Sequence, residues 1–181
     1  MNQDLETAVS NITKALKDKS TLLHSLCDCA PCLMWAKYAD GTYAYANAKH
    51  RKEFLGIGLT GSLQGVTDAG HPLADMCAAS DRVVLTRLQP IRTLESCTVS
   101  DGVPMFLQVD KAPWFGSHDQ LMGSVGVAVD VTDRILAQQD LVASFEGKIK
   151  ELGIESEMAE PMSKLKDYTN RHQYFERSEN G

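Results

Sequence analysis

The feature that most constrains the fold of this chain is an apolar stretch that runs directly into a helix. Residues 124–131 are mainly small and β-branched, which is typical of a buried strand. Polar residues then follow, and Thr132 or Asp133 can cap a helix that starts at Arg134. Because no loop separates strand from helix, a change at the sheet reaches whatever the helix contacts. We therefore expect Asp130, Thr132 and Asp133 to form a signal relay.

Further motifs follow one another in an order that resembles a known family. Asp40-Gly41 between extended residues predicts a tight hairpin, because glycine supplies the positive φ of the turn. In chain order the motifs are Ala30-Pro31 before an apolar strand, the hairpin with Tyr45 and Asn47, residues 65–68, the helical stretch 74–85, Glu95, the turn Asp101-Gly102, and Ala112-Pro113-Trp114. Together with 123–134 they resemble the PAS (Per-Arnt-Sim) sensory domain, in a subgroup often found ahead of helix-turn-helix or histidine-kinase output domains.

The resemblance implies an α+β PAS fold, a five-stranded antiparallel sheet with helices on one face. The resemblance covers residues 30–134 as the PAS domain. We expect an amphipathic dimerisation helix over 1–29 before it, and a helical signalling extension with a polar tail over 135–181 after it. Tyr38 is a departure, since the family usually has Asp three residues before the hairpin glycine. We also expect a last helix that begins near Pro161.

Both flanking segments carry apolar residues at alternating steps of four and three, the pattern of a heptad seam. The N-terminal seam is Leu5, Val9, Ile12, Leu16, Lys19, Leu23 and Leu26, and the later one is Ile135, Gln138, Val142, Phe145, Ile149 and Leu152. We predict a homodimer that pairs through these helices. The alternative is that each helix only covers a face of its own sheet.

Charge and length restrict the partners. The net charge is −6 and the basic residues are scattered, so we predict no direct contact with nucleic acid. No window is apolar enough to span a membrane, and we predict a cytoplasmic protein. Residues 153–181 are too few for a kinase or a helix-turn-helix, so we expect either a stand-alone sensor or a chain whose output domain is absent.

Strand periodicity suggests which side chains face an internal pocket. Apolar residues at alternate positions and on the flanking helix predict a lining of Met34, Tyr45, Met76, Leu107 and Val127. Such a lining suits a small, mostly apolar ligand held by one or two polar groups. The alternative is an ordinary packed core without a ligand. His50 and His118 are expected on the surface.

No cofactor is identified by the sequence. The cysteine-containing helix of flavin photosensors is absent around Cys77, and His71 is a weak candidate for a haem ligand. His24, Cys27, Cys29 and Cys32 are a weak candidate for a metal or redox site, because they lack the paired spacing of zinc sites. The alternative is that these cysteines pack as small apolar residues.

Catalytic motifs such as Gly-x-Ser-x-Gly, a phosphate-binding loop or His-Glu-x-x-His do not occur, so we predict that the chain is not an enzyme. We expect a signal-transducing sensor that binds a small ligand or partner and regulates transcription or a two-component histidine-kinase pathway. The alternatives are a ligand-free module for interaction or dimerisation and a haem or thiol redox sensor.

Overall fold

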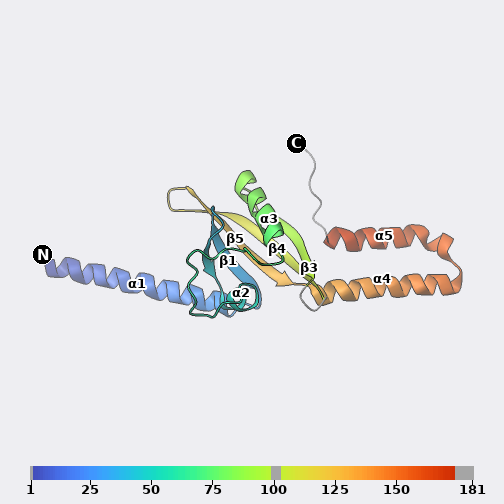
Figure 1. Cartoon of the computed structure of the whole chain (residues 1–181), viewed down its shortest axis with the longest axis horizontal. Helices are drawn as coiled ribbons and strands as arrows, with labels where there is room; N and C mark the ends of the chain where they lie inside the picture. Colours follow the sequence, from blue (N-terminus) through green and yellow to red (C-terminus); the bar gives the residue numbers. More distant parts are fainter. Residues whose placement is uncertain (1, 99–102, 174–181) are drawn as a thin grey trace.

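The computed structural model describes residues 2–98 and 103–173. Its centre is a five-stranded sheet with antiparallel neighbours throughout, in the order β2-β1-β5-β4-β3 (Figure 1). The strands are β1 Leu33–Tyr38, β2 Tyr43–Ala46, β3 Ile91–Thr98, β4 Pro104–Phe115 and β5 Leu121–Asp130. The predicted α+β fold is confirmed, whereas the turn expected at Asp101-Gly102 lies outside the described residues.

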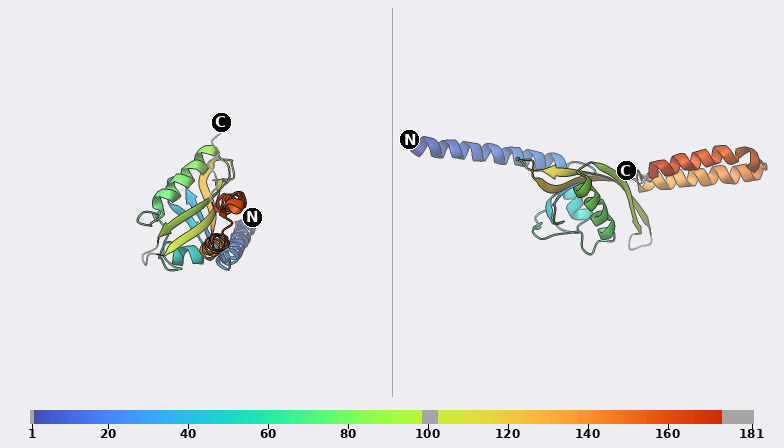
Figure 2. Two further views of the ribbon diagram at one scale, coloured as in Figure 1. Left: turned by 90° about the vertical axis from the view of Figure 1, so that its right-hand side faces the viewer. Right: turned by 90° about the horizontal axis from the view of Figure 1, so that it is seen from above.

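Two helices cover one face of this sheet. We call this face, beneath α2 Ala48–Glu53 and α3 Ala74–Arg87, the inner face, and the opposite one the outer face (Figure 2). Residues 54–73 connect the two helices without helix or strand. The prediction that helices cover one face is confirmed.

Longer helices extend from the two ends of the sheet. Helix α1 Asn2–Asp28 projects at one end, and α4 Thr132–Leu152 with α5 Glu155–Gln173 form an antiparallel hairpin at the other (Figures 1 and 2). None of the helices over residues 2–98 and 103–173 is long and apolar enough to cross a membrane.

The helical hairpin starts its second helix earlier than the sequence predicts. Gly153 ends α4 in the left-handed conformation, at φ 67°, which glycine adopts without strain. Helix α5 begins at Glu155 and Pro161 lies inside it, so the prediction that Pro161 opens the last helix is wrong. An ion pair between Lys166 and Glu146 joins the two helices.

The hairpin between β1 and β2 forms as predicted. Gly41 has φ 87°, and the Asp40 carboxylate accepts hydrogen bonds from the backbone N–H and hydroxyl of Thr42, at 2.9 and 2.7 Å. Strand β2 then contains a bulge, since Tyr45 pairs with Ala36 while Tyr43 pairs with the next residue of β1. The bulge places Tyr43 and Tyr45 on opposite faces of the sheet.

Asn47 fastens α1 to the sheet at the end of β2. Its fully buried side chain accepts hydrogen bonds from the backbone N–H groups of Met34 and His50, at 3.1 and 3.0 Å. It also donates to the carbonyl oxygens of Cys27 and Cys32, at 2.9 Å each. One side chain therefore caps α2 and fixes the end of α1 against β1.

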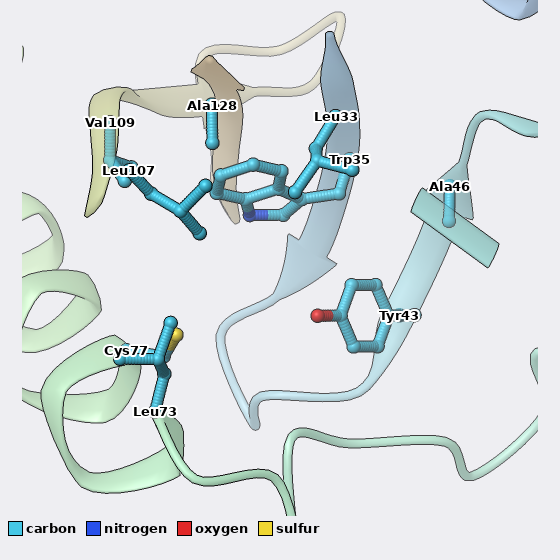
Figure 3. Packing of buried hydrophobic residues seen from close by; sticks show 9 residues of the cluster. All are labelled: Leu33, Trp35, Tyr43, Ala46, Leu73, Cys77, Leu107, Val109 and Ala128. Carbon is cyan, nitrogen blue, oxygen red and sulfur yellow. The ribbon is translucent and has the colours of Figure 1, made fainter. Parts of the chain in front are cut away.

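The hydrophobic core lies between the inner face and α3. Leu73 and Cys77, at the start of α3, pack towards apolar residues of β1, β2, β4 and β5 (Figure 3). The cluster consists of Leu33, Trp35, Tyr43, Ala46, Leu73, Cys77, Leu107, Val109 and Ala128. Fully burying each larger apolar side chain stabilises the fold by about 1.5–3 kcal/mol.

Candidate functional site

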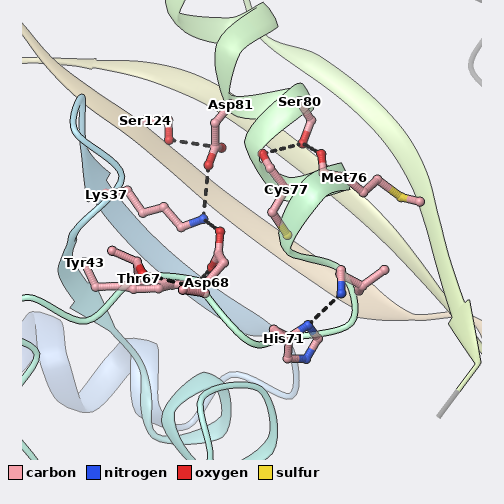
Figure 4. Close-up of polar contacts among 12 residues, drawn as sticks. Lys37, Tyr43, Thr67, Asp68, His71, Met76, Cys77, Ser80, Asp81 and Ser124 are labelled. Atoms are coloured by element: carbon pink, nitrogen blue, oxygen red, sulfur yellow. Dashed lines mark hydrogen bonds and ion pairs between the residues drawn. The ribbon is translucent and has the colours of Figure 1, made fainter.

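Two lysines lie buried on the inner face, where an apolar core would be expected. Lys37 on β1 and Lys111 on β4 are each 2% exposed. The Lys37 ammonium forms ion pairs with Asp68 and Asp81, the latter at 3.1 Å (Figure 4). The Lys111 ammonium lies 2.9 Å from Asp81 and donates to the Ser80 hydroxyl at 2.7 Å. Buried charges persist only when they are paired in this way.

The ion pairs of this polar cluster join α3 and the segment 54–73 to the sheet. Asp81 belongs to α3 and Asp68 to the segment 54–73. Burial by itself would lower the pKa of Lys37, but Asp81 and Asp68 outweigh it and the pKa is raised. Burial would raise the pKa of Asp81, but Lys111 and Lys37 outweigh it and the pKa is lowered. Both residues are therefore charged at neutral pH.

Glu95 closes the other side of the cluster. This buried carboxylate on β3 accepts hydrogen bonds from the hydroxyls of Ser80 and Thr93, at 3.0 and 3.3 Å. The Cys77 thiol lies 3.7 Å from the same carboxylate, and Lys111 lies 3.9 Å away. Burial and then Glu95 raise the pKa of Cys77 to about 12, so its thiol stays protonated.

A chain of hydrogen bonds runs from Asp68 to a buried histidine. The Tyr43 hydroxyl donates to Asp68 at 2.5 Å, and His50 Nε2 lies 3.1 Å from the Tyr43 oxygen. Burial and then the charge of Asp68 raise the pKa of Tyr43, so the phenol keeps its proton. Burial and then Lys37 lower the pKa of His50 to about 3, so its ring is neutral. His50 is 2% exposed, and the prediction that it lies on the surface is wrong.

A small void remains between these groups and the apolar core. Its volume is about 10 Å³, and its lining includes Trp35, His50, Cys77, Leu107 and Ala128. The Trp35 ring nitrogen points toward the middle of the core cluster (Figure 3). Trp35 Nε1 and His50 Nδ1 are buried and have no hydrogen-bond partner among the described residues. A void of this size holds about one water molecule.

The structure does not bring the five predicted pocket residues together. Leu107 lines the inner void, but Met34, Tyr45 and Val127 line an apolar groove of about 450 Å³ on the outer face. Met76 lies on α3 and is 40% exposed. The prediction of one shared pocket is therefore wrong.

The error has a physical cause on β5. Its inner positions are the small residues Ser124, Gly126 and Ala128, because a side chain at Gly126 would overlap the Trp35 ring. The valines of this strand therefore face outward, and the apolar side of the strand is not the side that the chain covers. The bulge in β2 likewise turns Tyr45 outward.

Comparison with known proteins shows which solved structures this chain resembles. No protein-family model and no curated protein matches the sequence. Among solved structures, the Vibrio cholerae VqmA–ligand–DNA complex is 25% identical, with a TM-score of 0.51, over 60% of this chain and 50% of that chain. VqmA bound to DPO is also 25% identical, with a TM-score of 0.52, over 63% and 59%. The Bordetella pertussis BvgS PAS domain is 20% identical, with a TM-score of 0.47, over 71% and 97%.

The chain has the PAS fold. It spans 50% and 59% of the two VqmA chains. The sheet with α2, α3 and their connecting segment forms the part with the PAS fold, called the PAS domain below, and α1 and α4 flank it.

The predicted relay residues lie where β5 meets α4. Asp130 accepts a hydrogen bond from the Thr132 N–H at 2.9 Å, and the Thr132 hydroxyl accepts one from the Phe106 N–H at 2.9 Å. The Val131 N–H donates to the Phe106 carbonyl, also at 2.9 Å. Helix α4 begins at Thr132 without a side-chain cap, so the predicted capping by Thr132 or Asp133 before Arg134 is wrong. Asp133 instead lies in the first turn, where a negative charge favours the helix dipole.

The alternative metal and haem residues do not assemble into sites in the described part of the PAS domain and α1. No group of three His, Cys, Asp or Glu there could hold a metal ion, and His24 stacks on Tyr45 with ring centroids 5.3 Å apart. Cys27 and Cys32 are half-buried, and Cys29 is exposed. His71 stacks on Phe54, and its Nδ1 accepts a hydrogen bond from the Leu73 N–H at 3.1 Å. The inner void of about 10 Å³ is far smaller than a haem.

The polar groups beside the inner void are not among the predicted site residues. Lys37 is the one charged residue of its strand, and Lys111 alternates with the apolar Leu107 and Val109, so strand periodicity offered a signal for both. Trp35 shares the face of Lys37 by simple alternation. Nothing in the sequence indicated that His50, between charged neighbours on a short helix, is buried.

Proposed function

We propose that the PAS domain is a sensory module that holds a small molecule in the inner cavity and passes its occupancy to α4. The observation that carries this proposal is a pair of buried polar atoms without partners, Trp35 Nε1 and His50 Nδ1, on two residues that line the void. A buried polar group without a partner costs about 1–3 kcal/mol. A molecule that supplies both partners recovers this energy, so the cavity favours an occupant.

The VqmA structures support this proposal and suggest an output. One is a complex of VqmA with ligand and DNA, and another has DPO bound. We propose that the present chain regulates transcription, with a histidine-kinase pathway as the alternative output. The absence of direct contact with nucleic acid and the cytoplasmic location stay predictions.

The connection from cavity to helix is short. Leu107 lines the void, and the neighbouring Phe106 offers its backbone N–H and carbonyl to Thr132 and Val131 at the start of α4. An occupant that pushes Leu107 would therefore also move Phe106, whose backbone is hydrogen-bonded to the start of α4. We propose that Asp130 and Thr132 hold this junction, and that Asp133 stabilises the first turn.

We propose further that two copies pair through α1 and the outer face. Ile12 and Leu16 on α1 are 61% and 63% exposed, so the rest of the described chain leaves these two seam positions largely uncovered. The nearby groove with Met34, Tyr45 and Val127 is apolar as well. Replacing Ile12 and Leu16 by Asp would place charges in the seam and should yield monomers with an intact sheet. Light scattering on a column would show this, and a persistent dimer would remove α1 from the interface.

The sensory proposal is tested by filling each side of the sheet separately. Native mass spectrometry and an absorption spectrum of freshly purified protein first report any bound molecule, which is then added back in thermal-shift assays. Ala128→Leu should fill the inner void and abolish the shift in melting temperature. Val127→Leu, on the next residue and the opposite face, is the matched control and should keep it.

Two results would contradict this proposal, and the second would favour the ligand-free interaction module. An equal thermal shift in the Ala128→Leu protein and its parent would place the ligand outside the inner cavity. Absence of any bound mass, together with no hit in a metabolite screen, would show that the PAS core is simply filled.

A further inference from the structure

We infer that the inner cavity is built for an uncharged molecule with a hydrogen-bond acceptor and a donor on one edge, as in an amide, and that it rejects carboxylates and phosphates. The inference rests on the proposed function, because it presumes that the cavity holds a ligand. It follows from the hydrogen-bond directions and the charges around the void.

The acceptor and donor of the cavity are fixed by the buried chain of hydrogen bonds. An indole nitrogen can only donate, so Trp35 requires an acceptor from the occupant. Tyr43 donates its proton to Asp68, which leaves its oxygen to accept from His50 Nε2. Since His50 is neutral with its proton on Nε2, the partnerless Nδ1 carries a lone pair and requires a donor.

Both cavity groups are deeply buried and close to each other. Trp35 is 7% exposed and His50 is 2% exposed, and their ring centroids lie 5.1 Å apart. The present void of about 10 Å³, which both residues line, has room for one water. A larger molecule with the same pattern must move a wall. The segment 54–73, which has no helix or strand, is the wall best able to do so.

The surrounding charges disfavour an anion. Each buried ammonium group already has a carboxylate partner, since Lys37 pairs with Asp68 and Asp81, and Lys111 with Asp81 and Glu95. Three carboxylates therefore face two ammonium groups in this cluster. A bound carboxylate or phosphate would find no unpaired cation there and would add to the formal negative excess at low dielectric.

Three probes of equal size separate these requirements. Benzamide offers a carbonyl acceptor and an N–H donor, benzoate offers acceptors only and is anionic, and benzamidinium offers donors only and is cationic. The full chain, labelled with ¹⁵N, is titrated with each probe while the indole N–H resonance of Trp35 is followed. We expect benzamide to shift this resonance and to bind about tenfold or more tightly than the other two, because each of them leaves one buried group unpaired.

Two tryptophan variants supply the controls. Trp35→Phe removes the indole donor and should erase the preference for benzamide over benzamidinium. Trp114→Phe leaves Trp35 as the remaining tryptophan, assigns its resonance, and should retain the benzamide shift. A loss of preference in both variants alike would contradict a specific role of Trp35.

The outcomes distinguish this inference from the function on which it rests. Stronger binding of benzoate, with a shift at Trp35, would overturn the charge and pattern argument while leaving a ligand-binding cavity in place. No shift with any probe would mean that water satisfies the pair, and the inference fails. The proposed function itself fails only when the Ala128→Leu and native-mass experiments also show no occupant.

Discussion

The two faces of one strand differ more than its sequence suggests. On β5, Ser124, Gly126 and Ala128 face the inner side, where Ser124 contacts Asp81 and Gly126 makes room for Trp35. Val125 and Val129 face the outer side and are 37% and 46% exposed. On β5 the covered face thus carries small residues next to the buried ion pairs, and the open face carries the valines. In the proposed function the inner face serves recognition and the outer face serves association.

The test with the largest expected effect compares two carboxylates on opposite sides of the sheet. Asp81 joins both buried lysines, whereas Asp110 pairs with Arg92 at 2.6 Å where both side chains are exposed. Asp81→Asn should lower the free energy of unfolding by about 3 kcal/mol, because it leaves buried ammonium groups undercompensated. Asp110→Asn should change it by less than about 1 kcal/mol. Urea unfolding measures both, and equal losses would contradict the contrast.

A second test uses the pH dependence of the inner face. The folded pKa of His50 is about 3, below the usual value of 6.5, so the unfolded state binds more protons between these values. Neutral His50 therefore contributes stability that is present above pH 6.5 and lost as the pH falls towards 3. The slope from this one group approaches about 1.4 kcal/mol per pH unit.

Carboxylates titrate in the same pH range as His50. The contribution of His50 is therefore found by comparing the slope of unfolding free energy against pH in variant and parent. His50→Gln should reduce the slope of unfolding free energy against pH between 3 and 6.5, even if it lowers stability throughout. His118→Gln, at an exposed position, is the control and should leave the slope unchanged. An unchanged slope in His50→Gln would mean that the His50 ring is not held neutral by burial.

These tests concern features that periodicity alone does not reveal. The hairpin at Asp40-Gly41 and the junction of β5 with α4 could be predicted, because turn chemistry and propensity act locally. Alternation correctly groups Val125 with Val127 but does not say which face the chain itself covers. The bulge that separates Tyr43 from Tyr45, and the burial of His50, depend on contacts between distant segments.

A third test compares two glycines, one on the inner face and one on an extension. A methyl group at Gly126 would overlap the Trp35 ring, whereas at Gly147 on α4 it would meet open space. Gly126→Ala should therefore lower the free energy of unfolding by about 1–3 kcal/mol through overpacking. Gly147→Ala should raise it by about 0.5–1 kcal/mol, since alanine favours helix. Thermal unfolding would show opposite signs, and a stabilising Gly126→Ala would mean that the inner void is larger.

The smallest expected effect lies at the junction between sheet and helix. Thr132→Val removes the hydroxyl that accepts the hydrogen bond from the Phe106 N–H but keeps the shape of the side chain. The loss should be about 0.5–1.5 kcal/mol, with faster hydrogen exchange at the Phe106 amide. Thr132→Ser keeps the hydroxyl and should exchange as the parent does. Because Phe106 adjoins Leu107 at the void, the proposed relay also requires Thr132→Val to weaken the response of α4 to an occupant. A spin-label distance between α4 and the sheet that changes equally in Thr132→Val and its parent would show that the signal leaves the inner face by another route.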